Sequence, residues 1–354
     1  MVSREITYAQ AILEATDQCM ASDPSVYILG LGVTDPNGIF GTTLGLEKKY
    51  GSKRVLDMPV AENGMTGVAI GSALVGMRPI MTHQRIDFML LSLDQVINNA
   101  AKWHYMFGGQ MKVPLVIRLL IGRGWGQGPQ HSQSLQALFA HIPGLKVAMP
   151  TTPYDVKGLL VSAVRDDNPV IFIEHRWLYN ITGNVPKELY EIPIGKAKNI
   201  KEGKDVTIVS SSYATLETLK AAKILEKFEI DAEIIDLRSI KPIDKKTILD
   251  SVAKTGRLVV VDGAWRSFGV SAEILALVAE NSHGLLKRAP KRVAFPDVPT
   301  PTSWALARHY YPKVSDIVNT VRAVFDLPAQ SEEQLGISYD IPLDVPDRKF
   351  TGPF

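Results

Sequence analysis

Val170-Ile171-Phe172-Ile173 is an uninterrupted apolar run of strand length that follows the turn-like sequence Asp166-Asp167-Asn168-Pro169. Earlier in the chain, similar runs occur at Val26-Tyr27-Ile28-Leu29, Pro79-Ile80-Met81 and Leu115-Val116-Ile117. Strands that are apolar on both faces are typical of a parallel sheet covered by helices on both sides. These runs therefore predict a parallel sheet in the first half of the chain.

Residues at helical spacing lie between these strands, most clearly Leu93, Val96, Ile97, Ala100 and Ala101. Ser92 and Gln95 predict a capping box at the start of that helix. Strands that alternate with helices form βαβ units, and a series of such units builds a doubly wound sheet. Because ligands of such sheets bind at the carboxyl ends of the strands, functional residues are expected there.

A second series of strands and helices begins after a polar, Lys- and Gly-rich stretch at residues 191–205. Its apolar runs are Val206-Thr207-Ile208-Val209, Ala232-Glu233-Ile234-Ile235 and Leu258-Val259-Val260-Val261, and Leu216, Leu219, Ala222 and Leu225 mark one helix face. The sequence therefore predicts an α/β protein with two doubly wound parallel-sheet domains. The expected boundaries are 1–190 for the first domain, 191–205 for a linker, 206–330 for the second domain and 331–354 for an extended tail.

The composition argues against several classes of protein. The 354 residues are 45% hydrophobic and 21% charged, and their net charge of +2 is atypical of nucleic-acid-binding proteins. A single cysteine, Cys19, allows no intrachain disulfide and fits a reducing compartment. The most membrane-like run, Gly64 to Met77, is too short to span a bilayer, and no targeting signal is evident. We expect a cytoplasmic protein that binds neither nucleic acid nor membrane.

Glu62 ends the segment Asp57-Met58-Pro59-Val60-Ala61-Glu62 and precedes a run of small residues, Val68-Ala69-Ile70-Gly71-Ser72-Ala73-Leu74. The spacing places its carboxyl group at a junction between a strand and a close-packed helix. A carboxyl group in such a place is expected to be buried and able to bind a ring nitrogen of a cofactor. The alternative is a solvated glutamate in a loop.

His131 follows Gly122-Arg123-Gly124-Trp125-Gly126-Gln127-Gly128-Pro129, a run too rich in glycine for regular structure. A histidine at the end of such a loop suits proton donation or stabilisation of an oxyanion near neutral pH. The alternative is a loop histidine with a local hydrogen bond. Phe88, considered alone, is a core aromatic.

Six motifs in a fixed order carry a family resemblance. They are Arg54-Val55-Leu56-Asp57-Met58-Pro59 with Glu62, Gly76-Met77-Arg78-Pro79-Ile80, Asp94-Gln95-Val96-Ile97-Asn98, Tyr105-Met106 with Gly108-Gly109, Gln130-His131-Ser132-Gln133 and Pro143-Gly144-Leu145-Lys146-Val147. In this order the chain resembles the β subunit of pyruvate dehydrogenase E1 and the related branched-chain 2-oxo acid and acetoin dehydrogenase β subunits, in the transketolase superfamily. The resemblance runs from about Ile6 to Val324 and includes Ser239-Ile240-Lys241-Pro242 and Val261-Asp262-Gly263. It implies a pyrimidine-binding domain followed by a transketolase C-terminal-like domain.

The resemblance implies thiamine diphosphate as the cofactor. It assigns Glu62 to N1′ of the aminopyrimidine, where the carboxyl group favours the imino tautomer that deprotonates the thiazolium ring. It places Phe88 against the pyrimidine ring and His131 in the active site, where it aids carboxylate recognition and acyl transfer. It further implies a monovalent cation such as K⁺, held mostly by backbone carbonyls at Leu115, Ala163, Val164, Asp166 and Asn168.

One part of the expected cofactor site has no counterpart in this chain. The family signature for Mg²⁺ and diphosphate, Gly-Asp-Gly followed at a distance by Asn-Asn, does not occur in it. The resemblance therefore implies a separate α subunit that supplies this half, in an α2β2 heterotetramer with the cofactor between α and β. The small-residue helix after Glu62 is the expected contact surface.

Two departures from the family pattern concern the substrate. Gly30-Leu31-Gly32 stands where relatives commonly carry Gly-Glu-Asp or Gly-Glu-Glu, and Thr82-His83-Gln84-Arg85 replaces apolar or acidic residues just before Phe88. We hypothesise that His83 or Arg85 recognises a substrate other than pyruvate, one that carries extra hydroxyl groups or an anion. The alternative is a polar cluster that points to the surface.

A third departure concerns partners. Relatives often read Leu-Asp-Ala-Pro where this chain has Leu286-Lys287-Arg288-Ala289-Pro290, so Arg288 replaces an aspartate that can face a basic domain of the lipoyl-bearing E2 core. Like charges across an interface weaken binding. The sequence therefore predicts weak or no docking to a conventional E2, unless docking uses other residues.

These features together predict an E1-type β subunit that, with an α subunit, decarboxylates a 2-oxo acid and transfers the resulting acyl or hydroxyalkyl group. A first alternative is an E1-like carboligase that adds a two-carbon unit to an aldehyde, ketone or sugar without a lipoyl E2. A second alternative is a non-catalytic partner that stabilises or regulates an α-like subunit. The joint presence of Glu62, Phe88 and His131 argues against the second alternative.

Overall fold

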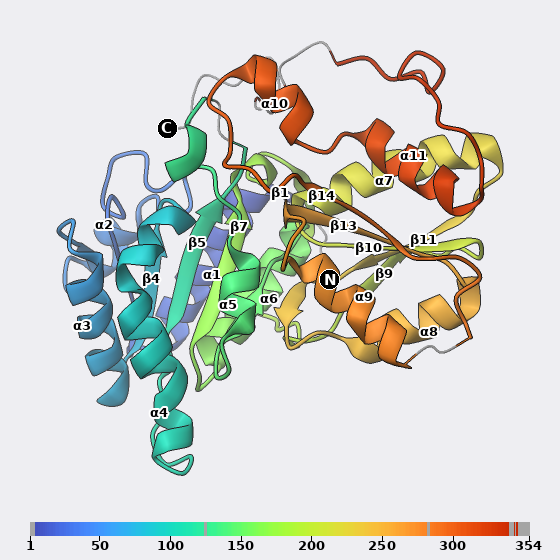
Figure 1. The fold of residues 1–354 in the computed structure, drawn as a ribbon. Helices are drawn as coiled ribbons and strands as arrows, with labels where there is room; N and C mark the ends of the chain where they lie inside the picture. Colours follow the sequence, from blue (N-terminus) through green and yellow to red (C-terminus); the bar gives the residue numbers. More distant parts are fainter. Residues whose placement is uncertain (1–3, 124–125, 282–283, 340–342, 344, 346–354) are drawn as a thin grey trace.

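The computed structural model describes residues 4–123, 126–281, 284–339, 343 and 345. Two α/β units lie side by side, each with a sheet covered by helices on both faces (Figure 1). The first unit contains β1 (Arg4–Thr7), α1 (Tyr8–Ser22), β2 (Val26–Gly30), α2 (Leu46–Tyr50), β3 (Val55–Asp57), α3 (Glu62–Leu74), β4 (Arg78–His83), α4 (Ala101–Met106), β5 (Val116–Ile121), α5 (Gln136–His141), β6 (Lys146–Ala148), α6 (Pro153–Arg165), β7 (Val170–His175) and β8 (Thr182–Val185). The predicted apolar strands of this half are thus confirmed.

The order of strands in the first sheet decides where a ligand can bind. The order is β12-β6-β7-β5-β4-β2-β3, and the strands from β6 to β3 run parallel. After β2 the chain moves to one neighbour, β3, and after β4 it moves to the other side, to β5. The connections therefore separate between β2 and β4, and the crevice at this switch point is the usual ligand site of such a sheet.

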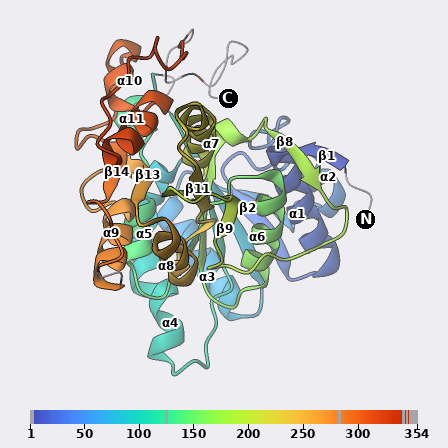
Figure 2. The same cartoon turned by 90° about the vertical axis from the view of Figure 1, so that its right-hand side faces the viewer.

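Two layers of helices bury the first sheet. On one face α1 packs against α6, with Tyr8, Ile12 and Leu159 fully buried, and β1 and β8 pair antiparallel beside them (Figure 2). Thr7 caps α1 through a capping box with Gln10. The other face is covered by α3, by the turns before α4, and by α5. Both faces of the strands are therefore apolar, as the sequence predicted.

The second unit contains β9 (Lys198–Lys201), β10 (Val206–Ser210), α7 (Tyr213–Leu225), β11 (Ala232–Asp236), β12 (Ser239–Lys241), α8 (Lys245–Thr255), β13 (Leu258–Trp265), α9 (Val270–Asn281), β14 (Lys291–Phe295), α10 (Trp304–Tyr310) and α11 (Val314–Val324). Its sheet has the order β14-β13-β10-β11-β9. Helices α7 and α11 cover one face and α8 and α9 the other (Figure 1). The apolar residues beneath α8 and α9 join those of the first unit in one continuous core, so the two units pack as one body.

Both sheets are mixed rather than purely parallel. Strand β12 leaves the second unit and pairs antiparallel with β6, at the edge of the first sheet. Strand β9 lies within the stretch 191–205 and pairs antiparallel with β11. Part of the expected linker is therefore an edge strand of the second sheet, which its Lys-rich composition did not suggest.

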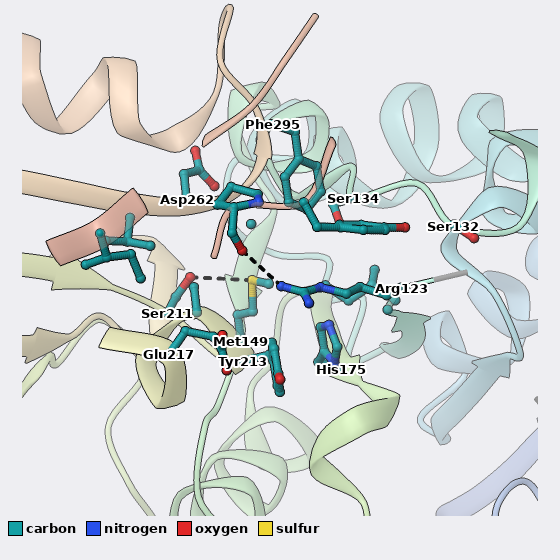
Figure 3. A pocket seen from close by; sticks show the side chains of 18 residues that line it. Arg123, Ser132, Ser134, Met149, His175, Ser211, Tyr213, Glu217, Asp262 and Phe295 are labelled. Atoms are coloured by element: carbon teal, nitrogen blue, oxygen red, sulfur yellow. Dashed lines mark hydrogen bonds between the residues drawn. The ribbon is translucent and has the colours of Figure 1, made fainter. Parts of the chain in front are cut away.

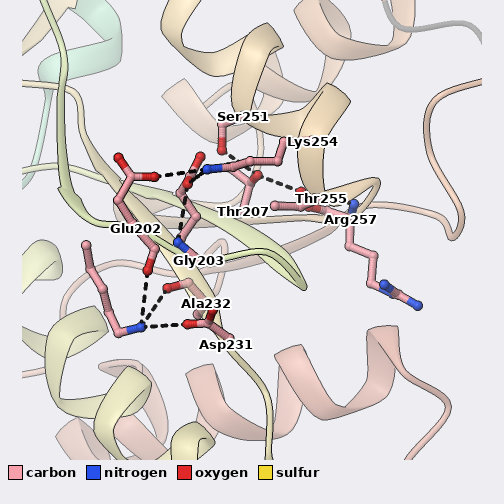
Figure 4. A network of polar contacts seen from close by, with 11 residues as sticks. Glu202, Gly203, Thr207, Asp231, Ala232, Ser251, Lys254, Thr255 and Arg257 are labelled. Atoms are coloured by element: carbon pink, nitrogen blue, oxygen red, sulfur yellow. Dashed lines mark hydrogen bonds and ion pairs between the residues drawn. The ribbon is translucent and has the colours of Figure 1, made fainter.

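A polar network fastens β9 to the second sheet (Figure 4). Lys254 binds the carboxylates of Glu202 (3.0 Å) and Glu233, and Glu233 also accepts a bond from the Gly203 N–H (3.3 Å). Burial opposes ionisation of Glu233, but the Lys254 ammonium and the other hydrogen bonds hold its pKa below its usual value. Nearby, Lys201 reaches Asp231 (3.0 Å).

Two local expectations need comment. The predicted capping box of Ser92 and Gln95 is wrong, because a 3₁₀ turn, Ile86–Ser92 (η1), runs into a π-helical turn, Gln95–Ala100 (η2), with no side-chain cap. The Ser92 hydroxyl is buried without a partner among the described residues. The tail 331–354 is described to residue 339, where Leu335 packs on the core of the second unit, and most of its remainder lies outside the described residues. Within the described chain, no helix has the length and apolarity needed to cross a membrane.

Candidate active site

Glu62 is the first residue of α3 and follows the short connection from β3. The structure buries its side chain, which is 6% exposed, although Ala61 before it and Asn63 after it are exposed. The first turn of a helix favours a carboxylate because unpaired N–H groups point toward it. Glu62 is therefore a buried residue at the start of a helix and not a solvated glutamate in a loop.

The contacts of the first turn of α3 place Glu62 beside β4 and η1. The Thr66 hydroxyl donates to the Glu62 carbonyl (2.7 Å) and contacts the sulfur of Met81 in β4 (3.4 Å). The Asn63 amide donates to the carbonyl of Leu91 in η1 (3.2 Å). Glu62 thus lies next to the segment that carries Phe88.

Phe88 and His131 are brought together by the fold. Their rings meet edge to face, with centroids 5.3 Å apart and planes at 88°. Beside them, the Gln133 amide donates to Asp87 Oδ1 (2.7 Å), which ties the loop after His131 to η1. Burial raises the pKa of Asp87, and this hydrogen bond partly opposes the rise.

His83 and Arg85 are both buried, with 2% and 3% exposure, so the alternative of a surface-pointing cluster is wrong. His83 ends β4, and burial lowers its pKa to about 4, which keeps its ring neutral near pH 7. Its Nε2 has no partner among the described residues. Arg85 donates to the Gln84 carbonyl (2.6 Å) and to Gln127 Oε1 (3.2 Å), and burial lowers its pKa.

The glycines of the Gly30-Leu31-Gly32 loop allow this crevice to close tightly. A Cβ atom on Gly30 would lie 2.5 Å from the carbonyl oxygen of Thr82. Gly32 has φ +76° and donates its N–H to Asp57 Oδ1 (2.9 Å), while the Gln84 amide donates to the Leu31 carbonyl (3.1 Å). The carboxyl ends of β2 and β4 are therefore joined directly at the switch point.

Sequence reasoning missed Arg176, which directly follows β7. It is 7% exposed and donates to Gln127 Oε1 (2.8 Å) and to the main-chain carbonyl of Arg123. Burial and the nearby Arg85 lower its pKa to about 9. Its place after an apolar strand was the signal that could have revealed it.

The five residues of the predicted cation site lie at the opposite edge of the sheet. Leu115 precedes β5 and Asn168 precedes β7, whereas Phe88 and His131 follow strands. The Arg78 guanidinium donates to the carbonyls of Val164 (3.0 Å) and Asp166 (3.1 Å), and Asp166 Oδ1 accepts the Asn168 N–H (2.9 Å). The turn-like sequence Asp166-Asp167-Asn168-Pro169 thus forms a turn, and a cation here would share carbonyls with Arg78.

A cavity of about 50 Å³ lies between the two units, near the loop that carries His131 (Figure 3). Its walls include Ser132 and Ser134 from the first unit, Tyr213 and Asp262 from the second, and His175. A cavity of this size holds only a few water molecules, whereas small-molecule sites measure about 300–1,000 Å³. It is therefore too small to serve as the substrate site.

Arg288, the residue that replaces the expected aspartate, is exposed and binds Asp326 through Nε (2.9 Å) and Nη2 (2.6 Å). Its charge is therefore compensated within the chain, but a cation rather than a carboxylate still occupies this position.

Comparisons with known proteins agree with this geometry. Residues 4–182 match the family described as "Transketolase, pyrimidine binding domain" and residues 195–317 match "Transketolase, C-terminal domain". The chain is 45% identical over 331 residues to the acetoin:2,6-dichlorophenolindophenol oxidoreductase subunit beta of Cupriavidus necator, covering 91% of this chain and 98% of that protein. It is 43% identical to the mitochondrial pyruvate dehydrogenase E1 component subunit beta-2 of Oryza sativa (90% and 86% covered) and 41% identical to the E1 component subunit beta of Rickettsia felis (90% and 98% covered).

A solved structure, "Split gene transketolase, inactive beta4 tetramer", shares the fold, with a TM-score of 0.75, 23% identity, and 91% of this chain and 99% of that chain covered. The fold, both domain matches and the identity to these subunits agree with one another. The chain therefore belongs to the family of β subunits of thiamine-diphosphate-dependent E1 enzymes, the group that includes the pyruvate dehydrogenase and acetoin oxidoreductase β subunits.

Proposed function

We propose that this chain, with an α subunit, decarboxylates a 2-oxo acid and transfers the acyl or hydroxyalkyl group that remains. The observation that carries the proposal is the burial of Glu62 in the first turn of α3, beside the turn that holds Phe88. Those two residues, with His131, supply a carboxyl group, an aromatic face and an imidazole at one edge of the sheet.

The residues present fit thiamine diphosphate. When bound, this cofactor supplies a nucleophilic carbon that adds to the keto group of the substrate. Glu62 would hold the aminopyrimidine ring by a hydrogen bond to N1′, and Phe88, half-buried, would pack on the ring. The buried His83 Nε2 lacks a partner among the described residues and is a further group that a ligand at this edge could satisfy.

His131 would hold or donate a proton close to the reacting group. Its ring lies edge-on to Phe88, so the group that packs against Phe88 also lies near the imidazole. Histidine is the side chain that enzymes use most often for proton transfer. The link between Asp87 and Gln133 fixes the loop that presents His131.

An α subunit would supply Mg²⁺ and the diphosphate site, in an α2β2 assembly. Support comes from the names of the relatives, which are β subunits, and from two exposed apolar residues: Val68 in α3 is 57% exposed, and Val75, directly after α3, is 82% exposed. Exposed apolar residues on a helix are typical of a contact surface. A monovalent cation such as K⁺ would bind at the far edge, near Leu115 and Asn168.

The carboligase alternative has specific support in His83, Arg85 and Arg288. The buried neutral imidazole of His83 and the buried guanidinium of Arg85 would suit a larger or charged co-substrate, and Arg288 disfavours a basic E2 domain. Assays of acetoin-type carboligation and of lipoamide reduction, run on one preparation of the αβ complex, separate the two reactions.

The test of the proposal is Glu62→Gln in the complex with α. The loss of the carboxylate should lower turnover of 2-oxo acids, measured with 2,6-dichlorophenolindophenol as the electron acceptor, by at least about 100-fold. Glu47→Gln, at an exposed position in α2, is the matched control and should retain full activity. Full activity of Glu62→Gln would show instead that the chain is a non-catalytic partner.

A further inference from the structure

Three arginines follow three adjacent strands of the first sheet. Arg85 lies just beyond β4, Arg123 just beyond β5, and Arg176 directly follows β7. Their side chains are 3%, 8% and 7% exposed. Buried arginines are uncommon, so three of them at one edge of the sheet concentrate positive charge there.

Arg85 and Arg176 donate to the same atom, the side-chain oxygen of Gln127, at 3.2 and 2.8 Å. This acceptor is a neutral amide. The other acceptor of Arg176 is the main-chain carbonyl of Arg123, and Arg176 Nε has no acceptor among the described residues. Two guanidinium groups therefore converge on an oxygen that carries no net charge.

The acceptors of Arg123 are also neutral. It donates to the main-chain carbonyls of Leu343 (2.9 Å) and Pro312 (3.2 Å). Its guanidinium packs over the ring of Trp177 and over the ring of Tyr213, which Figure 3 shows beside it. These hydrogen bonds and rings hold Arg123 between the two units. The two arginines that share Gln127 as an acceptor are therefore Arg85 and Arg176, called the arginine pair below.

Of the two nearby carboxylates, Glu174 is engaged through both oxygens and Asp87 through one. Glu174, beside Arg176 in sequence, binds Arg118 through both oxygens and accepts the Tyr179 hydroxyl (2.8 Å). Asp87 is close enough to oppose the lowering of the Arg85 pKa by burial; its Oδ1 accepts the Gln133 amide, and its Oδ2 has no hydrogen-bond partner among the described residues. Burial and, after it, the like charge of Arg85 lower the pKa of Arg176.

A glycine and an aromatic ring make room for the two arginines and contact them. A Cβ atom on Gly122 would lie 2.8 Å from Cγ of Arg176, so glycine at this position, with φ +146°, makes room for the arginine. The Arg85 guanidinium lies over the ring of Phe40, 5.9 Å from its centroid. The main-chain N–H of Phe88 donates to the Arg85 carbonyl (3.3 Å), so Arg85 lies one 3₁₀ turn before Phe88, the residue proposed to pack on the cofactor.

We propose that Arg85 and Arg176, with Gln127 between them, form an oxyanion subsite that binds a phosphate or carboxylate group of the substrate, distinct from the carboxylate that is lost. The proposal rests on the proposed function, because it extends the same site. Guanidinium groups bind phosphate and carboxylate through paired N–H donors, and an oxyanion would supply the negative charge that the neutral amide lacks. The substrate class is thus a 2-oxo acid or an acceptor with a second anionic group.

The test measures binding rather than turnover. The αβ complex is titrated calorimetrically with inorganic phosphate and, separately, with succinate, at constant ionic strength. Gln127→Glu places a carboxylate at the shared acceptor without removing either arginine, and Arg176→Gln removes one guanidinium. Arg165→Gln, at a half-exposed arginine paired with Glu191, is the control.

We expect the unmodified complex to bind at least one probe, and both subsite variants to bind it at least tenfold more weakly, with Arg165→Gln unchanged. Binding of phosphate alone indicates a phosphate-bearing substrate, and binding of succinate alone indicates a distal carboxylate. If neither probe binds, or if Gln127→Glu binds as tightly as the unmodified complex, the subsite is refuted. Should Arg176→Gln fail to fold, Gln127→Glu decides alone.

The two proposals fail separately. A loss of activity in Glu62→Gln combined with unaltered probe binding in Gln127→Glu refutes the subsite alone. Weakened probe binding in Gln127→Glu combined with full activity in Glu62→Gln refutes the proposed catalysis and leaves the subsite standing.

Discussion

Phe88 and His131 meet edge to face, with ring centroids 5.3 Å apart, although they lie in different connections of the first sheet. Phe88 follows β4, and His131 follows β5, and these strands are neighbours in the sheet. Each residue had a plausible structural role when considered alone. Their contact at the carboxyl edge makes them two walls of one site.

Replacing Phe88 by leucine should weaken thiamine diphosphate binding. The change removes an aromatic face that would pack on the pyrimidine ring, a contact worth about 0.5–1.5 kcal/mol, so we expect roughly a two- to tenfold rise in the apparent Kd. Titration of the αβ complex with the cofactor measures this. Phe107→Leu is the control, since Phe107 packs on Trp103 instead. An unchanged Kd in Phe88→Leu would place the cofactor elsewhere.

Replacing Glu174 by glutamine should destabilise the chain strongly. Glu174 and Arg118 are fully buried and joined through Nε (2.6 Å) and Nη2 (3.0 Å). Breaking a buried pair from one side leaves an uncompensated charge, which costs about 3–5 kcal/mol. Urea unfolding measures the loss. Arg165→Gln should leave the midpoint almost unchanged, because that pair is half exposed. Equal midpoints for both variants would contradict the argument.

His83 should make the protein less stable in mild acid. Burial lowers its pKa to about 4 in the folded chain, against an ordinary value of 6.5. Above pH 6.5 the ring is neutral in both states. As the pH falls below 6.5, the unfolded chain takes up a proton that the folded chain does not, so stability falls until about pH 4. The shift corresponds to roughly 3 kcal/mol at most.

The measurement compares unfolding free energies of the unmodified chain and His83→Leu from pH 7.5 to 4. The difference between them should change over this window in favour of the variant. His141→Gln, at an exposed histidine, controls for the loss of a histidine in general. A constant difference between the unmodified chain and His83→Leu across the window would refute the prediction.

The sequence predicted those parts of the fold and site that depend on local pattern. Runs such as Val170–Ile173 form strands because both of their faces are buried, and a run of that kind has few other stable environments. The placement of Glu62 followed in the same way, since the small residues after it form the helix whose first turn buries it. Features that depend only on neighbouring residues could therefore be predicted from the sequence pattern.

The remaining features depend on contacts between distant segments. The side chain of Gln127 joins Arg85 to Arg176, and no local sequence signal links these three positions. Strand β12 belongs in sequence to the second unit but pairs with β6 of the first, a contact that no local pattern in either strand predicts. The pairing of Arg288 with Asp326, likewise, joins residues from two elements that only the fold brings together.

Potassium should affect stability rather than substrate affinity. The proposed carbonyl site near Leu115 and Asn168 precedes β5 and β7, and six-residue strands separate it from the catalytic edge by roughly 20 Å. A cation bound at 100 times its Kd stabilises the folded chain by about 2.7 kcal/mol. We therefore expect exchange of K⁺ for Li⁺ to lower the Tm and to leave KM unchanged. A change in KM with no change in Tm would contradict this placement.

Arg288 should prevent docking of a conventional E2 core. The αβ complex is expected not to bind the subunit-binding domain of a lipoyl E2, whereas Arg288→Asp should gain binding, because the substitution replaces a repelling cation by an anion that attracts a basic domain. The exchange should not unfold the chain, since Arg288 and Asp326 have 56% and 65% exposed side chains and such pairs contribute little to stability. Gel filtration with the isolated E2 domain measures the effect, and Lys291→Asp, at another exposed cation nearby, is the control.

In Arg288→Asp, Asp326 would face a second acid. The double variant Arg288→Asp with Asp326→Arg therefore tests whether the charge at residue 288 itself decides binding of the E2 domain. Co-elution of the unmodified complex with the E2 domain would show that docking uses another surface.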